Sequence, residues 1–265
     1  NMKEEYWVIR SGRYGIGIDE EVIGTMQPDQ LPEGIKLEYF YNANPRHEIT
    51  LKTVQVCRSL VTAAAFQAFV EATGFETLAE KEHWGWVWEK GWTKREGVSW
   101  RNPFGDEADV LYRENTGQLP VLQLCWNDAE AYCDWLTQTR DDLYRLPTEG
   151  EWEVFAEMAG VPSLRAADWT EERKEYSRST DMVEQMMRTL ETCGSGHPVG
   201  LLWEWCEDWF DSYPSGRENK EYGTVYKVLR GGSLQSHPLQ RTREYRFRRC
   251  PTARSPFYGF RVVRV

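Results

Sequence analysis

Four short segments rich in tryptophan, glycine and charged residues follow one another in the second half of this 265-residue chain. They are residues 145–153 (RLPTEGEWE), 202–209 (LWEWCEDW), 230–233 (RGGS) and 259–261 (GFR). Several ordered motifs of this kind rarely arise together by chance. Their order therefore restricts the fold more than any other feature, and a fold assigned to the chain has to account for all four.

The first motif predicts a helix. Thr148 is a favourable N-cap, and Glu151 three residues later completes a capping box. The buried stripe of this helix is expected to be Trp152, Phe155 and Ala156. The same reasoning predicts a helix capped by Asn127, with Glu130 at N3 and an inward stripe of Ala131, Trp135 and Leu136.

Residue periodicity predicts one more helix and four strands. The helix begins after Thr62, buries Phe66, Phe69 and Val70, and ends at Gly74. Alternating or β-rich runs predict strands within residues 47–56, 200–210, 225–233 and 259–265. Residues 234–258 have no clean period, so we expect an irregular excursion between two strands. We find no linker that would divide the chain, so residues 1–265 are interpreted as one domain, with residues 1–44 packed on it as an N-terminal extension.

The chain holds thirteen tryptophans and six cysteines. This density of aromatic residues excludes disorder and allows large buried surfaces or a ligand site. The tryptophans of residues 203–209 are expected in the core, and those of residues 84–92 in a long surface loop that either packs on the helices or extends a ligand surface. The cysteines form no CxxC pair, which favours free core thiols over a zinc site or a disulfide framework.

The net charge of −10 conceals an asymmetry along the chain. Residues 230–265 carry nine arginines, no lysine and one acid, Glu244, so this tail is +8 and the rest of the chain is −18. The acidic remainder disfavours binding to nucleic acid. We expect Arg230 and Arg261 to brace the fold, whereas the arginines between 241 and 248 either bind a partner or pair with acids of the same chain.

Taken together, the four motifs resemble those of the formylglycine-generating-enzyme/sulfatase-modifying-factor family, and the resemblance covers about residues 45–265. It implies an α+β, C-type lectin fold of the formylglycine-generating-enzyme type, with mixed antiparallel sheets, a few flanking helices and long loops. Enzymes of this family use two cysteines just after RGGS to bind copper and oxidise a substrate cysteine. The matching positions here are Ser236 and Arg241, which supply no thiolate. We therefore expect no catalytic residues, no metal ligands and no oxidase activity.

The family's calcium ligands are not matched either. Gly200 and Leu201 stand where the family has Gly-Asn, which removes an oxygen ligand. The acids Asp106, Glu107 and Asp109 are the remaining candidates for calcium, although such a cluster is more often solvated surface. No cofactor is expected.

A second branch of this fold fits the C-terminal segment better. Residues 230–265 resemble the variable regions of proteins diversified by bacterial retroelements, in which a tolerant loop follows an RGGS-type strand and the chain ends soon after GFR. Diversification at adenines would leave Gln235, Gln240 and Glu244 as fixed scaffold. The predicted ligand-binding residues lie within 234–258; they are Leu234, Ser236, Pro238, Leu239, Arg241, Arg243, Tyr245, Phe247, Arg248, Ala253, Phe257 and Tyr258.

These observations predict a non-catalytic, ligand-binding protein with a diversified C-terminal surface. The expected partner is a protein or other macromolecule with acidic groups, because arginine and flat aromatic side chains dominate interface hot spots. The alternative is a metal-dependent oxidase or another enzyme of the same superfamily. His237 beside Ser236 does not suggest catalysis, because neighbouring residues of an extended chain point to opposite faces. We further expect a monomer without a transmembrane segment, located at a bacterial cell surface or secreted, with any leader outside this chain.

Overall fold

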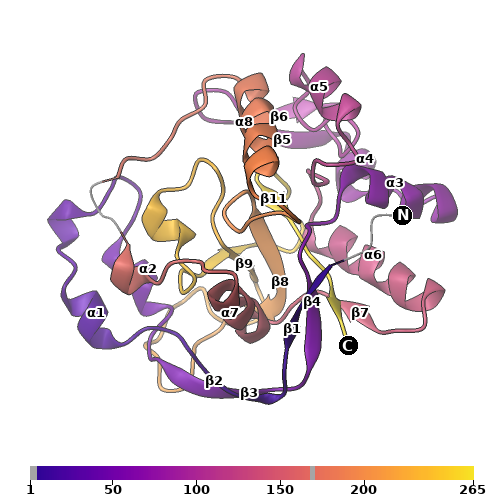
Figure 1. Cartoon of the computed structure of the whole chain (residues 1–265). Helices are drawn as coiled ribbons and strands as arrows, with labels where there is room; N and C mark the ends of the chain where they lie inside the picture. Colours follow the sequence, from indigo (N-terminus) through magenta and orange to yellow (C-terminus); the bar gives the residue numbers. More distant parts are fainter. Residues whose placement is uncertain (1–4, 168–170) are drawn as a thin grey trace.

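The computed structural model describes residues 5–167 and 171–265 and confirms the predicted α+β class. Two four-stranded sheets lie at the centre, and two hairpins and the helices surround them (Figure 1). The helices are α1 (Glu20–Gly24), α2 (Leu37–Tyr41), α3 (Ala63–Thr73), α4 (Leu78–Glu82), α5 (Ala108–Glu114), α6 (Trp126–Thr139), α7 (Glu149–Met158) and α8 (Ser179–Thr192). No helix in the described ranges is both long and apolar enough to cross a membrane.

The first sheet joins segments from both ends of the chain. Its order is β1 (Tyr6–Ile9), β4 (Val54–Cys57), β12 (Val263–Arg264) and β7 (Tyr144–Arg145), and all neighbours are antiparallel. Val56 pairs with Trp7 on one side and with Val263 on the other. The C-terminal strand is therefore an inner strand, as Figure 1 shows where the yellow end of the ribbon passes between β4 and β7.

Three of the four motifs begin or lie in the second sheet. Its order is β10 (Phe247–Arg249), β9 (Lys227–Arg230), β8 (Trp203–Trp209) and β11 (Tyr258–Gly259), and β11 runs parallel to β8. Helix α7, which carries the first motif, packs against β1 of one sheet and against β8 and β9 of the other. All four motifs therefore meet around α7 and the two sheets.

Two hairpins and three 3₁₀ turns complete the part of the fold that the structure describes. The hairpins are β2 (Gly12–Ile16) with β3 (His47–Leu51), and β5 (Trp84–Trp88) with β6 (Trp92–Glu96). The turns are η1 (Pro28–Gln30), η2 (Leu164–Ala166) and η3 (Pro238–Arg241). The tryptophans that we expected in a surface loop therefore lie on a regular hairpin.

Two of the three predicted helices form with the expected caps. Thr62 accepts the N–H of Ala65, and Gly74 ends α3 in the left-handed conformation. Thr148 and Glu151 form both halves of the capping box of α7. Hydrogen bonds between residues close in the sequence were therefore sufficient to predict these helix ends.

The cap predicted for α6 is wrong by two residues. The N-cap is Cys125, because the Asp128 carboxylate accepts the Cys125 N–H at 3.0 Å. Asn127 is exposed in the first turn. Of the predicted inward stripe, Leu136 is buried, whereas Ala131 and Trp135 are only partly buried; Tyr132 and Cys133 complete the buried face.

The strand predictions are right in place but too long. Residues 47–56 form two strands, since β3 pairs within a hairpin while β4 belongs to the first sheet. Residues 259–265 likewise divide between β11 and β12, which lie in different sheets. Burial does not alternate along the first half of β8. Residues 203–206 are all buried, because both faces of this inner strand are covered.

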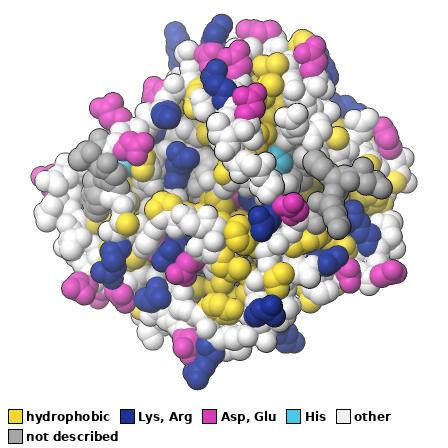
Figure 2. Space-filling view, viewed as in Figure 1, with side chains coloured by type: hydrophobic (Ala, Val, Ile, Leu, Met, Phe, Trp, Pro, Cys, Tyr) yellow, Lys and Arg dark blue, Asp and Glu magenta, His cyan; other side chains and the backbone are white. Residues whose placement is uncertain are grey.

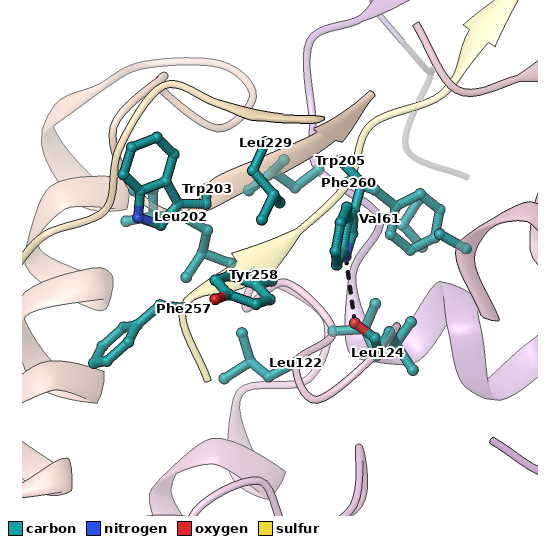
Figure 3. Close-up of a cluster of buried hydrophobic side chains, with 14 of the residues drawn as sticks. Val61, Leu122, Leu124, Leu202, Trp203, Trp205, Leu229, Phe257, Tyr258 and Phe260 are labelled. Carbon is teal, nitrogen blue, oxygen red and sulfur yellow. Dashed lines mark hydrogen bonds between the residues drawn. The ribbon is translucent and has the colours of Figure 1, made fainter. Parts of the chain in front are cut away.

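The core is assembled around the second sheet. Figure 3 shows Trp203 and Trp205 from β8 facing Leu229, Tyr258, Phe260 and other apolar side chains from five chain segments. The Trp205 indole N–H donates to the Leu124 carbonyl at 3.4 Å, the dashed line in that view. Trp203 and Trp205 are buried, as predicted for this motif, whereas Trp209 at the strand end is exposed.

The segment 1–44 contributes to this core, although residues 1–4 lie outside the described ranges. Strand β1 belongs to the first sheet, and Ile23 and Phe40 from the short helices are buried in the main cluster. The Asn42 carbonyl accepts a hydrogen bond from the Arg246 guanidinium at 2.7 Å. This segment thus reaches side chains of the C-terminal tail.

Candidate functional site

The structure buries half of the predicted ligand-binding residues. Six side chains lie in the interior; they are Leu234, Ser236, Leu239, Tyr245, Phe257 and Tyr258. Their exposed fractions range from 0% for Leu239 to 8% for Ser236, so each presents little area to a macromolecule in this conformation. Tyr258 still lines a pocket, and ligand binding by these six residues stays a prediction. Their burial shows that a segment without periodicity supplies core side chains when turns fold it over a sheet.

The other six predicted residues are partly exposed but do not share one site. Pro238 and Arg241 line one pocket, and Arg248 lines another. Ala253 lines a third pocket, while Arg243 contacts Glu157 and Glu244 at 3.6 and 3.5 Å. Phe247 stacks on Trp203, with ring centroids 4.5 Å apart. The predicted single surface is therefore divided.

The tail arginines have two kinds of surroundings. Arg230 and Arg261 are fully buried and ion-paired, which confirms their predicted bracing role. Arg246 was predicted among the residues available to a partner, but only 1% of it is exposed. On the face in Figure 2, basic and acidic side chains are interspersed. Much of the positive charge of the tail is thus neutralised within the fold.

Glu149 at the start of α7 joins two of these arginines. Its carboxylate accepts hydrogen bonds from Arg246 at 2.8 Å and from Arg230 at 3.1 Å. Arg230 also donates to Glu153 at 3.0 Å. Burial alone would raise the pKa of Glu149, but the two guanidinium groups outweigh it and hold this pKa below its ordinary value.

A second buried pair links the tryptophan motif to the GFR motif. Arg261 donates two hydrogen bonds to Glu204, at 2.5 and 2.9 Å. Trp152 donates its indole N–H to the same carboxylate at 3.1 Å. Glu204 therefore bonds an arginine inside the fold, as expected from its position between two tryptophans. Paired, bidentate geometry of this kind is what allows both charges to be buried.

Asp208 on β8 has a carboxyl pKa raised from 3.8 to about 6, first by burial and then by the negative charge of Glu149. The folded state therefore binds a proton more tightly than the unfolded state, and this group lowers stability as pH rises from about 4 to about 6. Asp208→Asn is expected to stabilise the protein at about pH 7.5 by on the order of 1 to 2 kcal/mol and to change little at about pH 4.

Urea denaturation at the two pH values measures this effect, with Asp211→Asn as the control. Asp211 is an exposed acid on the same segment, so its substitution controls for the loss of a surface carboxylate. An equal loss of stability at both pH values for Asp208→Asn would contradict the prediction, because it would show that the side chain acts only through its hydrogen bond to the Glu149 N–H.

The positions of the family's cysteine pair have other structural roles here. The Ser236 hydroxyl accepts the Ser233 N–H at 2.9 Å and so closes a turn after the two glycines of the RGGS motif. A Cβ at Gly232, whose φ is +72°, would lie 2.6 Å from Arg241 Cγ. Arg241 thus packs on the RGGS turn. A hydroxyl held in a turn and a guanidinium do not fit a cuprous ion.

The remaining thiols and acids do not replace that site. All six cysteines are free, and burial raises the pKa of the Cys125 thiol to about 12. Asp109 accepts the N–H groups of Phe104 and Gly105, and Asp106 accepts that of Ala108. Among the described residues no group of three or more His, Cys, Asp or Glu side chains is placed to hold a metal ion.

The tryptophan hairpin meets the C-terminal segment at a pocket of about 290 Å³. We call it the tryptophan–arginine pocket, and it is lined by Trp86, Trp92, Arg249, Ala253, Arg254, Ser255 and Tyr258. Trp92 is 47% exposed and contacts Phe257 edge to face at 5.5 Å. Arg254 is buried, stacks on Trp84 at 3.7 Å and pairs with Glu82 at 2.6 Å. The hairpin is therefore fixed to the tail by an arginine.

Arg249 supplies the exposed charge of this pocket. Its guanidinium lies over the Phe247 ring at 4.1 Å, and no carboxylate in the described ranges pairs with it. An exposed indole beside an unpaired guanidinium can bind a flat or anionic group. The sequence did not indicate Arg249, because nothing in the RR dipeptide at 248–249 shows which arginine pairs with Glu221 and which faces solvent.

His237 uses Nδ1 to accept the Leu239 N–H, so it is not a free base.

Comparisons with known proteins agree with this geometry. A family model, the sulfatase-modifying factor enzyme 1-like domain, matches residues 2–265. A formylglycine-generating enzyme of Streptomyces coelicolor is 31% identical in an alignment of 237 positions that covers 73% of this chain and 71% of that protein. Another from Thermomonospora curvata is 27% identical over 290 residues and covers 91% of this chain and 89% of its own.

Two solved structures share the fold. PvdO from Pseudomonas aeruginosa has a TM-score of 0.63 and 21% identity, and covers 98% of this chain and 94% of its own. Variable protein 1 of Treponema denticola has a TM-score of 0.55 and 16% identity, with the same coverage. The predicted C-type lectin fold of the formylglycine-generating-enzyme type is thereby confirmed.

Proposed function

Because the chain belongs to the sulfatase-modifying factor enzyme 1-like family, we propose that it is a non-catalytic member that binds an acidic protein or other acidic macromolecule. The observation that carries this proposal is the replacement of the cysteine pair by Ser236 and Arg241, both of which serve the RGGS turn. A site without thiolates lacks the donors that a cuprous ion requires.

The tryptophan–arginine pocket is the binding site in this proposal. It joins a solvent-exposed indole, Trp92, to the guanidinium of Arg249, which donates to the Arg248 carbonyl and has no carboxylate partner among the described residues. Lys94 extends the positive charge along β6, with its ammonium group 4.1 Å from the Trp84 ring. Aromatic and arginine side chains dominate binding hot spots, and their charge suits a carboxylate-bearing partner.

The proposal has a second, more specific part, which is that a retroelement diversifies the C-terminal segment. Support comes from the motif order and from the fold shared with the Treponema denticola variable protein. Within this proposal, variation is expected at the partly exposed members of the predicted set, which are Pro238, Arg241, Arg243, Phe247, Arg248 and Ala253. A near-copy of the DNA for residues 234–258, differing at adenines beside a reverse-transcriptase gene, is the expected genomic observation; its absence would remove this part.

Binding is tested with poly-L-glutamate as a defined acidic probe, using the tryptophan fluorescence of the full chain. We expect saturable binding that weakens by about tenfold or more in Trp92→Ala and in Arg249→Gln, because each removes a hot-spot side chain. The matched control is Arg188→Gln, since Arg188 is an exposed arginine on α8. Equal binding by all three variants, or no binding by the wild type, would contradict the proposed site.

The second candidate function is metal-dependent oxidation of a cysteine. It is favoured by the relatives, which are formylglycine-generating enzymes. Copper and iron analysis of the purified protein, with turnover assays on a cysteine peptide, separates the two functions. We expect no stoichiometric metal and no turnover, with the Streptomyces coelicolor enzyme as the positive control. Stoichiometric metal together with turnover would overturn the non-catalytic assignment.

A further inference from the structure

A second pocket, of about 460 Å³, shares no lining residue with the tryptophan–arginine pocket. Its polar side chains include Arg58, His197 and Arg241, and Phe155, Val161 and Val199 form much of its apolar wall. We call it the two-arginine pocket. It lies where α7, the loop before β8 and the η3 turn come together. The two arginines come from segments far apart in the sequence.

Both arginines of this pocket lack a carboxylate partner among the described residues. Arg58 lies over the Trp7 ring at 4.2 Å, and its buried Nε–H has no hydrogen-bond acceptor. Arg241 packs beside Gly200 and the RGGS turn. Arg243, Arg246 and Arg248 in the same tail are all ion-paired. Two guanidinium groups without an ion-pair partner outnumber the one carboxylate that lines this concave site, Glu171, and favour binding of an anion.

His197 lines the pocket and is held firmly in place. Only 8% of this residue is exposed, and Nε2 lies 2.7 Å from the Gln118 carbonyl, so Nε2 carries the hydrogen. Nδ1 is then an acceptor, and it has no partner. Burial lowers the pKa of His197 to about 4, which keeps the ring neutral near pH 7. The backbone N–H of His197 donates to the Arg58 carbonyl at 3.0 Å, so the backbones of these two residues are fixed to each other.

We infer that the two-arginine pocket binds a carboxylate carried on a small apolar group. The guanidinium groups of Arg58 and Arg241 bind the carboxylate, and the apolar wall contacts the hydrocarbon group. Glu171 in the wall would repel a second negative charge, which favours a monoanion over phosphate dianion. An N-acylated amino acid and the C-terminus of a peptide share this chemistry.

Isothermal titration of the full chain with N-acetyl-leucine tests the inference. We expect saturable one-to-one binding, and no binding of N-acetyl-leucinamide, which has the same shape without the charge. Arg241→Gln and Arg58→Gln keep the side-chain stem but remove the charge, and each should weaken binding by about tenfold or more. Arg241→Lys should recover part of the loss. Circular dichroism melting establishes that each variant is folded.

Arg249→Gln is the control, since it alters only the other pocket; unchanged N-acetyl-leucine binding in that variant separates this inference from the proposed function. Equal binding of the amide, indifference to Arg241→Gln, or no binding of N-acetyl-leucine would overturn the inference. Tighter binding of inorganic phosphate would overturn the assignment to a carboxylate. A leucine-ending acetylated tripeptide distinguishes the sources: binding at least as tight as N-acetyl-leucine supports a peptide terminus, and exclusion supports a free acid.

Discussion

Glu149→Gln is expected to lower the free energy of unfolding by about 3–5 kcal/mol, because it leaves a buried guanidinium without its counter-ion. Arg246 pairs with Glu149 alone among the described carboxylates, whereas Arg230 keeps Glu153. The amide of glutamine can still accept a hydrogen bond, but it carries no charge. The loss should therefore reflect the uncompensated positive charge of Arg246. Urea denaturation at neutral pH measures it.

Two further variants show whether charge is the cause. Glu157→Gln changes a carboxylate on the same helix that is exposed and 3.6 Å from Arg243, so it should cost less than about 1 kcal/mol. Adding Arg246→Met to Glu149→Gln removes both charges, and the double variant should be less destabilised than the sum of the two single changes. Additive losses would refute a charge-based role for this pair.

The motif arginines show what the sequence could predict. Arg230 and Arg261 lie in short, specific motifs, and the family resemblance was enough to assign them to the interior. The helix caps at Thr62 and Thr148 were predictable for a different reason, since each depends on residues three positions apart. At Cys125 the competing acceptor Asp128 also binds the Leu78 N–H from another segment, and no local pattern reveals that contact.

The candidate sites were less predictable, because they form between distant segments. Arg58 and Arg241 carry no motif that links them, yet they line one pocket. The hairpin tryptophans were noticed in the sequence, but their contact with Phe257 depends on how β11 is placed beside β8. Conversely, Tyr245 and Phe257 have the composition of binding residues and serve in the core. Composition identified the segment, and only tertiary contacts separate its buried side chains from its exposed ones.

Arg261→Met is expected to have a loss of similar size, about 3–5 kcal/mol, since Glu204 would remain buried without its counter-ion. Trp152 would still donate one hydrogen bond to this carboxylate. The three carbonyls of Cys57, Arg58 and His197 would each lose the guanidinium as a donor. Arg264→Met is the matched control, because Arg264 is half-exposed and lies 3.6 Å from Asp142, and it should change stability by less than about 1 kcal/mol.

This substitution also connects the buried pair to the two-arginine pocket. Arg261 holds the carbonyls of Arg58 and His197, so its loss should loosen Arg58, which is proposed to bind the carboxylate, and the adjoining wall of the pocket at His197. At a temperature where Arg261→Met remains folded, its affinity for N-acetyl-leucine should fall, whereas Arg264→Met should bind like the wild type. Adding Glu204→Gln should recover stability by removing the unpaired charge, but it should not recover affinity, because the carbonyls stay without their donor. Recovery of both together would mean that Arg261 affects the pocket only through overall stability.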